Sequence, residues 1–161
     1  MYYYLTCINI NVKKSFNYKQ GVFKPSNPEK YKGTYPIIYR SSLELRFMRY
    51  LDRSANVVTW GSESVIIPYQ DPLSKTKKLR RYFIDNNVTM KTKNGLKKYL
   101  VEIKPFSQTY APVTKRHTKS SMKKVETYVK NRAKWKAAQE WCERKGDVEF
   151  IIITEKDLQN V

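Results

Sequence analysis

Residues 80–104 read RRYFIDNNVTMKTKNGLKKYLVEIK, and their pattern predicts the central part of a β-sheet. Two runs rich in β-branched and aromatic residues, Arg80–Met90 and Leu96–Lys104, are separated by Lys93-Asn94-Gly95. An Asn-Gly pair between two such runs is a strong signal for a tight turn. We therefore predict that the two runs form an antiparallel hairpin.

Three charged side chains interrupt this hairpin: Asp85, Glu102 and Lys104. Because side chains alternate across a strand, Glu102 and Lys104 should share one face, and the pairing can place Asp85 beside Glu102. Two carboxylates held close together repel each other unless a hard divalent cation such as Mg²⁺ binds between them. Such a cation polarises a phosphoryl oxygen and generates hydroxide from water. Lys104 could orient or deprotonate that water, or neutralise the charge that develops on phosphorus.

The acid-x-Lys triplet is weak evidence when it is taken alone. It occurs twice, at Glu102-x-Lys104 and Glu143-x-Lys145, about as often as chance predicts for this composition. The second triplet ends a predicted helix and is typical of a solvated surface. The first interrupts an apolar strand, where charges are unexpected unless they are exposed on one face or functional. Both of these interpretations stay open at this point.

The chain before the hairpin is expected to contribute a helix and two strands. Ser41 or Ser42 can cap a helix that runs to about Arg53 with apolar residues at helical spacing. Glu44, in its first turn, is either an acid favoured by the helix dipole or a further metal ligand. Val57–Trp60 and Ser64–Tyr69 have strand patterns. Residues 12–38 carry several Pro, Gly and Lys residues, which argue against a regular element.

The chain after the hairpin is expected to form a long helix and a last strand. Apolar residues keep a helical period from about Ser120 to Arg144, and Gly146 is a natural C-cap. Val148–Thr154 is a nearly continuous apolar run, which is typical of a buried strand. The order of elements predicts an α/β fold in which helices flank a mixed β-sheet.

Composition limits the class of protein. The chain has 161 residues, enough for one domain, and 32 Lys and Arg against 14 Asp and Glu give a formal charge of +18. Such an excess favours a polyanionic partner. No apolar run approaches the ~20 residues that a membrane span needs, and the N-terminus lacks the pattern of a signal peptide. Cys7, Cys142 and His117 are too few for a disulfide framework or a Cys/His zinc site. We therefore expect an intracellular protein that binds nucleic acid.

Basic residues gather before Asp85 and after Lys104. Each run alone could be a solvated turn, but several runs around one candidate site favour contacts with phosphate. We expect these side chains to hold the DNA backbone rather than to read bases. The candidates are Lys77, Lys78, Arg80, Arg81, Lys115, Arg116, His117 and Lys119.

A longer series of motifs resembles a known family. The order Glu44, Asp85, Glu102-x-Lys104 is similar to the PD-(D/E)xK nuclease superfamily. The strings that extend this likeness are Asn27-Pro28-Glu29-Lys30-Tyr31-Lys32-Gly33, Tyr39-Arg40-Ser41-Ser42-Leu43-Glu44, Trp60-Gly61-Ser62-Glu63, Ile67-Pro68-Tyr69, Arg81-Tyr82-Phe83-Ile84-Asp85, Glu102-Ile103-Lys104-Pro105, Lys134-Trp135-Lys136-Ala137-Ala138 and Ile153-Thr154-Glu155. Together they resemble the head completion nucleases of contractile-tailed phages and, more distantly, the nuclease subunit of TnsA-type transposases.

The resemblance covers about residues 20–158 and implies a restriction-endonuclease-like domain over 20–161, with residues 1–19 as an extension of unknown role. It implies a DNA nuclease with little sequence specificity that depends on Mg²⁺, with Mn²⁺ as a substitute. Asp85, Glu102 and Glu44 become metal ligands, Lys104 the catalytic lysine, and Gln108 a residue that lines the site.

The expected partners are double-stranded DNA and the head, portal or neck proteins of a phage, and the expected locations are the infected host cytoplasm and the virion. The alternative function is a head-completion protein that binds DNA or the portal without cleaving DNA.

Overall fold

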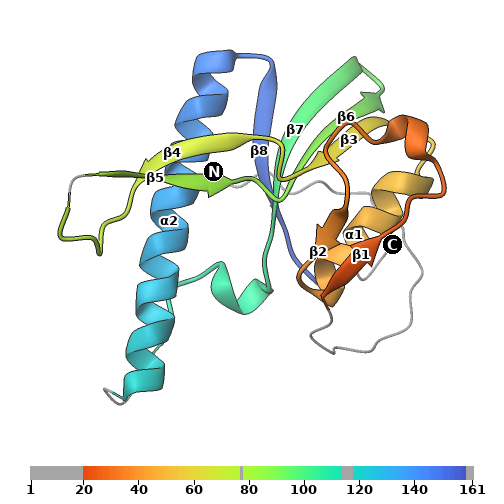
Figure 1. Ribbon diagram of the computed structural model, residues 1–161. Helices are drawn as coiled ribbons and strands as arrows, with labels where there is room; N and C mark the ends of the chain where they lie inside the picture. Colours follow the sequence, from red (N-terminus) through yellow and green to blue (C-terminus); the bar gives the residue numbers. More distant parts are fainter. Residues whose placement is uncertain (1–19, 77, 114–117, 159–161) are drawn as a thin grey trace.

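The computed structural model describes residues 20–76, 78–113 and 118–158. Its centre is a mixed sheet with the strand order β3 (Val57–Ser62), β6 (Asn86–Thr92), β7 (Gly95–Ile103) and β8 (Val148–Ile153) (Figure 1). The β3–β6 and β6–β7 pairs are antiparallel, and β8 runs parallel to β7. This arrangement confirms the predicted α/β class with a mixed sheet.

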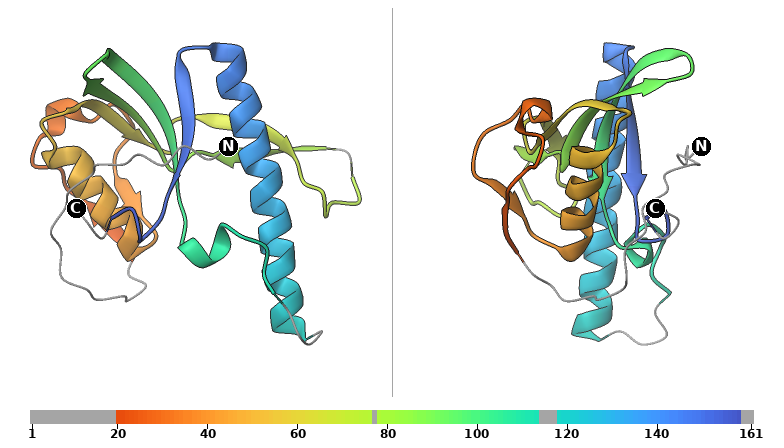
Figure 2. Two further views of the ribbon diagram at one scale, coloured as in Figure 1. Left: turned by 180° about the vertical axis from the view of Figure 1, so that it is seen from behind. Right: turned by 90° about the vertical axis from the view of Figure 1, so that its right-hand side faces the viewer.

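The two faces of the sheet are covered by different helices (Figure 2). Helix α1 (Ser42–Arg53) begins at Ser41, whose side chain accepts the Glu44 N–H as predicted for an N-cap. Helix α2 (Lys119–Lys145) ends at Gly146, which has a left-handed φ of 77°. These helices confirm the elements predicted from apolar periodicity. None of the helices in the described ranges is long and apolar enough to cross a membrane.

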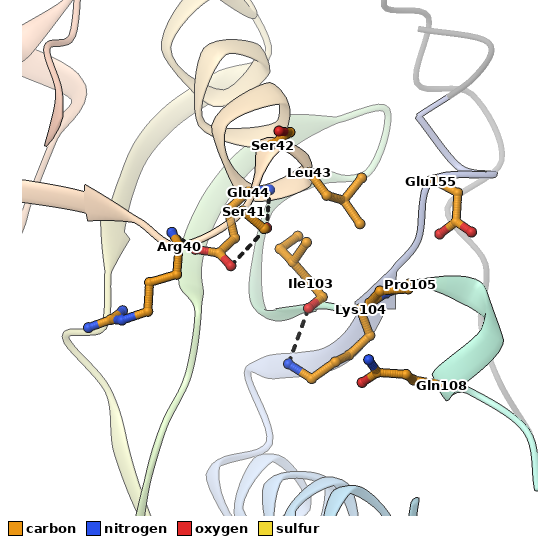
Figure 3. A pocket seen from close by; sticks show the side chains of 10 residues that line it. All are labelled: Arg40, Ser41, Ser42, Leu43, Glu44, Ile103, Lys104, Pro105, Gln108 and Glu155. Carbon is orange, nitrogen blue, oxygen red and sulfur yellow. Dashed lines mark hydrogen bonds between the residues drawn. The ribbon is translucent and has the colours of Figure 1, made fainter. Parts of the chain in front are cut away.

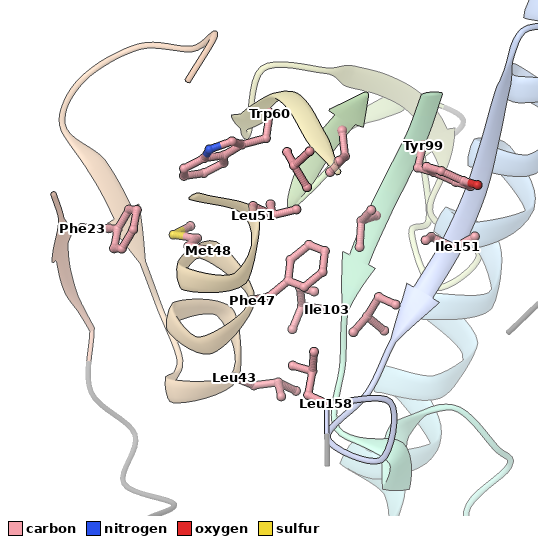
Figure 4. Packing of buried hydrophobic residues seen from close by; sticks show 14 of the residues in the cluster. Phe23, Leu43, Phe47, Met48, Leu51, Trp60, Tyr99, Ile103, Ile151 and Leu158 are labelled. Atoms are coloured by element: carbon pink, nitrogen blue, oxygen red, sulfur yellow. The ribbon is translucent and has the colours of Figure 1, made fainter. Parts of the chain in front are cut away.

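The second half of strand β7, Tyr99–Ile103, is buried on both faces, and each face packs against a different helix. Tyr99, Val101 and Ile103 pack with Leu43, Phe47, Met48 and Leu51 of α1 (Figure 4). Leu100, on the other face, packs with Ala138 and Cys142 of α2. Glu102 follows in the Leu100 row and is 2% exposed. The carboxylate of Glu102 is therefore enclosed by the fold, so an exposed strand face is excluded for it.

The predicted hairpin is present, but its first strand is shorter than predicted. Residues 86–92 pair with 95–101 across a turn at Lys93-Asn94, and Gly95 has a left-handed φ of 104°. Arg80–Met90 is not one strand, because β5 (Leu79–Phe83) pairs instead with β4 (Ile66–Gln70) in a separate ribbon. The break lies at Ile84-Asp85, where Ile84 is buried among residues of this ribbon and α2.

The expectation that residues 12–38 hold no regular element is wrong in the described part of that range. Strands β1 (Gly21–Phe23) and β2 (Ile37–Tyr39) pair, and η1 (Pro28–Lys30) lies between them. Phe23 and Ile37 are buried against the α1 cluster, and this burial holds the ribbon in place. The extension at residues 1–19 lies outside the described residues.

The last strand also differs from expectation in its place. A buried strand was predicted, but within the described residues β8 lies at an edge of the sheet. Its buried residues are Ile151 and Ile153. A helix of 27 residues, α2, precedes it and crosses the sheet, which allows β8 to return parallel to β7. The 3₁₀ turn η2 (Phe106–Gln108) follows β7 and leads toward α2.

Candidate active site

Asp85, Glu102 and Lys104 come together where β7 ends and the chain crosses from β5 to β6. Lys104 Nζ lies 2.7 Å from Glu102 Oε1 and 3.9 Å from Asp85 Oδ2. The pairing of Asn86 with Val101 brings the preceding Asp85 opposite Glu102. The placement predicted from strand alternation is therefore confirmed for these three residues.

Asp85 is fixed by the backbone of the neighbouring strand. Its Oδ2 accepts a hydrogen bond of 2.7 Å from the Ile103 N–H. Burial and the nearby charge of Glu102 raise the pKa of Asp85 to about 8, although Lys104 and the Ile103 N–H act in the opposite direction. The enclosed position and the charge of Glu102 therefore oppose the ionisation of Asp85.

Glu102 is held by a tyrosine that the sequence did not single out. Tyr82 OH donates a hydrogen bond of 2.7 Å to Glu102 Oε2, and Tyr82 is 2% exposed. Burial, followed by the charge of Glu102, raises the pKa of Tyr82 well above its usual value, so its hydroxyl stays a donor. The alternation of β5 could have indicated this role, because Tyr82 is the inward-facing residue of an otherwise exposed strand.

Lys104 keeps its proton in this environment. Burial lowers the pKa of Lys104, but Asp85 and Glu102 outweigh it and raise the pKa to about 12. Its Nζ also donates to the Ile103 carbonyl at 3.2 Å. Lys104 is thus an ammonium that compensates carboxylate charge in the metal-free protein.

Glu44 reaches the site by its charge rather than by contact. Its Oε1 accepts from Ser41 Oγ at 2.9 Å, and its Oε2 accepts from the Arg40 N–H at 2.7 Å. Its charge contributes to the raised pKa values of both Asp85 and Lys104. Among residues 20–76, 78–113 and 118–158, no three His, Cys, Asp or Glu side chains form a group that could hold a metal ion.

Arg40 and Glu63 form an ion pair next to these carboxylates. Glu63 has a left-handed φ of 50°, and its N–H donates to the Asp85 carbonyl at 3.2 Å. The hydrogen bond to Glu63, and then the charges of Glu63, Glu44 and Asp85, raise the pKa of Arg40. A non-glycine residue with this backbone is uncommon and is often found at functional sites. No pattern in the sequence singled out Arg40 as a site residue.

A pocket of about 420 Å³ opens beside Lys104 (Figure 3). It lies between the first turn of α1, the end of β7 and η2. Its lining residues are Arg40, Ser41, Ser42, Leu43, Glu44, Ile103, Lys104, Pro105, Gln108 and Glu155. Gln108 thus lies at the pocket that Lys104 borders, in agreement with the place implied for it by the family resemblance.

The basic candidates that the structure describes lie along β5 and at the start of α2. Arg80 Nε pairs with the buried Asp71 at 3.3 Å, whereas the Arg81 guanidinium lies 4.8 Å from the centre of the Phe83 ring on the exposed side of the ribbon. Lys78 and Lys119 are exposed. The other four candidates, Lys77, Lys115, Arg116 and His117, lie outside the described residues.

Comparison with known proteins identifies the family of this chain. Residues 54–155 match the family model described as the TnsA-like endonuclease N-terminal domain. The chain belongs to the TnsA-like endonuclease family. It is also 38% identical over 145 residues to the head completion nuclease of Enterobacteria phage T4, an alignment that covers 86% of this chain and 93% of that protein.

The TnsA-like endonuclease region contains part of the site. The matched segment runs from the residue after α1 to the residue after Thr154, so it includes Asp85, Glu102 and Lys104. Arg40 and Glu44 precede it. The longer match to the T4 protein extends the likeness beyond the family domain. These matches support a nuclease with the restriction-endonuclease-like fold.

Proposed function

We propose that this chain is a divalent-metal-dependent deoxyribonuclease that cuts phosphodiester bonds endonucleolytically with little sequence specificity. We further propose that it acts in phage head completion after DNA packaging, with head, portal or neck proteins as partners. The observation that carries the activity is the pair of carboxylates, the buried Glu102 and the half-buried Asp85, that share the ammonium of Lys104. Membership in an endonuclease family and the likeness to a head completion nuclease support it.

The carboxylates of the site fit a hard divalent cation. Once ionised, Asp85 and Glu102 bring two negative charges with Glu44 nearby, while Lys104 supplies one positive charge, 2.7 Å from Glu102 and 3.9 Å from Asp85. Carboxylate oxygens are the ligands that Mg²⁺ prefers, and Mn²⁺ accepts the same donors. Asp85 and Glu102 would hold the ion, with Glu44 as a supporting acid. When bound, it would polarise the phosphoryl oxygen and lower the pKa of a coordinated water.

The remaining residues hold the two carboxylates in position and neutralise charge on the phosphate. Tyr82 and the Ile103 N–H each hold one carboxylate at 2.7 Å, so neither is free to turn away. Lys104, which stays protonated, can hold a non-bridging phosphate oxygen and offset the negative charge that develops during attack by water. Lys78, Arg81 and Lys119 would contact the sugar–phosphate backbone outside the reacting centre.

The test is cleavage of supercoiled and linear plasmid, side by side, in Mg²⁺, in Mn²⁺ and in EDTA. Glu102→Gln keeps the size of the side chain and removes its charge, and Asp85→Asn does the same on the neighbouring strand. Glu143→Gln is the matched control, because Glu143 and Lys145 repeat the acid-x-Lys spacing on the exposed end of α2. We expect both site variants and EDTA to abolish cleavage and the control to cleave normally.

The two substrates separate the possible modes of cleavage. Relaxed and then linear products from supercoiled plasmid indicate an endonuclease, whereas loss of linear DNA alone indicates an exonuclease. Normal turnover by folded Glu102→Gln would refute the assignment of the site. Absence of cleavage by folded wild type that still binds DNA would favour the non-catalytic head-completion role instead.

A further inference from the structure

The pocket beside Lys104 is larger than a phosphate contact requires. We propose that it receives the base and sugar of the nucleotide next to the scissile phosphate, so that the preferred substrate is DNA with an unpaired nucleotide there, as at frayed ends and flaps. This inference rests on the proposed nuclease function. The inference adds a substrate class to that function, because the bases of an intact duplex are stacked and cannot enter a pocket.

Position is the first support for this inference. Lys104 borders the pocket and also contacts Glu102 at 2.7 Å, so the pocket and the reacting centre share one side chain. A phosphate held by the Lys104 ammonium therefore has its neighbouring nucleotide at the pocket mouth. Arg40, whose side chain is 54% exposed and pairs with Glu63, lies at the other side of the lining (Figure 3).

The walls provide the second support. Leu43, Ile103 and Pro105 form an apolar lining, and the volume of about 420 Å³ is within the range of pockets that enclose small organic ligands. Phosphate groups gain nothing from such walls, whereas a base or a sugar can be buried against them. The pocket thus suits the part of a nucleotide that lies away from its charges.

Gln108 supplies the third support. Its side chain points from η2 toward Lys104 in Figure 3, and its amide has no hydrogen-bond partner within residues 20–76, 78–113 and 118–158. An amide carries both a donor and an acceptor, so it can pair with the edge of any base. An adaptable amide beside the apolar part of the lining would hold a base without selecting its identity, as a nuclease with little sequence specificity requires.

The consequence is a difference between substrates. Enzymes that place a base in a pocket must first take it out of the stack, and this step is easiest where the base is mismatched or already single-stranded. A labelled duplex with one unpaired nucleotide should therefore be cut beside that nucleotide at least about tenfold faster than the fully paired duplex of the same sequence.

Variants of neighbouring residues test the pocket itself. Gln108→Trp places a large ring in the pocket, and Ser107→Trp is its matched control on the exposed side of the same turn. We expect Gln108→Trp to lose most of the preference for the unpaired substrate and Ser107→Trp to keep it. Gln108→Ala leaves the pocket open, so its preference for the unpaired substrate should fall only a few-fold. An abasic site at the unpaired position should restore cleavage by Gln108→Trp.

A binding measurement makes the result independent of turnover. Fluorescence anisotropy in EDTA measures how tightly wild type and Gln108→Trp bind the paired and the unpaired duplex. If wild type binds the unpaired duplex more tightly and the variant does not, the result supports a pocket that receives the unpaired nucleotide. Equal binding and equal cleavage of the two duplexes by wild type overturn this inference and leave the nuclease assignment intact. Absence of cleavage on every substrate, with binding preference retained, overturns the nuclease assignment and leaves the pocket.

Discussion

Replacing Asp85 by Asn is expected to stabilise the metal-free protein while it abolishes cleavage. The Asn side chain keeps the size and can keep the acceptor for the Ile103 N–H, which now bonds to Asp85 Oδ2 at 2.7 Å. It removes a carboxylate whose ionisation is opposed by burial and by Glu102. Glu102 keeps both Tyr82 and Lys104 as partners in the variant. A site built to bind a cation thus costs stability when no cation is bound.

The difference in free energy of unfolding between Asp85→Asn and wild type depends on pH in a defined direction. The pKa of Asp85 is raised to about 8 in the folded protein, against about 4 in an unfolded chain. The folded state therefore binds more protons between these values, and its stability falls as pH rises through this window. One proton corresponds to about 1.4 kcal/mol per pH unit, which sets an upper limit of about 3 kcal/mol between pH 5 and pH 7. We expect the advantage of Asp85→Asn to grow by about 1–3 kcal/mol over that interval.

Urea denaturation in EDTA, followed by tryptophan fluorescence, measures this difference at each pH. Asp147→Asn is the control, because its pairing with Lys98 lowers the pKa of Asp147, so no growth between pH 5 and pH 7 is expected for it. Added Mg²⁺ should stabilise wild type more than Asp85→Asn. The reasoning is refuted if Asp85→Asn is no more stable than wild type at pH 7, or if its advantage is the same at both pH values.

Other predictions concern residues that hold the site and its scaffold. Tyr82→Phe removes the 2.7 Å bond to Glu102, and urea denaturation should show a loss of about 1.5–3 kcal/mol, with slower plasmid cleavage. Asp52→Ala removes the buried acceptor of two backbone N–H groups before η1; a loss of about 2–4 kcal/mol is expected, and an unchanged midpoint would contradict it. Gly146→Ala places a side chain at φ 77° and should lower stability by about 1 kcal/mol, as thermal denaturation can check.

The candidate site was predictable where local rules act alone. The turn at Lys93-Asn94-Gly95 fixes the register of the hairpin, and strand alternation then places Asp85 near Glu102 and Lys104. The caps of α1 and α2 follow from short-range hydrogen bonding in the same way. These features need no knowledge of the rest of the chain, and for this reason the sequence could indicate them.

The features that the sequence missed depend on contacts between distant segments. Arg80–Met90 has one continuous strand pattern, yet Ile84 is buried among residues of α2 and the β4–β5 ribbon, so the chain changes partners there. The ribbon of β1 and β2 forms despite many Pro and Gly residues because Phe23 and Ile37 are buried against α1. Arg40 joins the site through its pairing with Glu63, which is 23 residues away in the sequence. None of these pairings has a local signal.

The two acid-x-Lys triplets show why spacing alone does not define a site. Glu143 and Lys145 lie at the exposed end of α2, where two residues of separation point side chains in different directions and water screens their charges. Glu102 and Lys104 are on a strand, where the same separation places them on one face, and Tyr82 and Asp85 close that face from the neighbouring segments. In this enclosed setting Glu102 and Asp85 both lie close to the single ammonium of Lys104. The chemistry follows from the strand and its neighbours, and the triplet marks a site only in that setting.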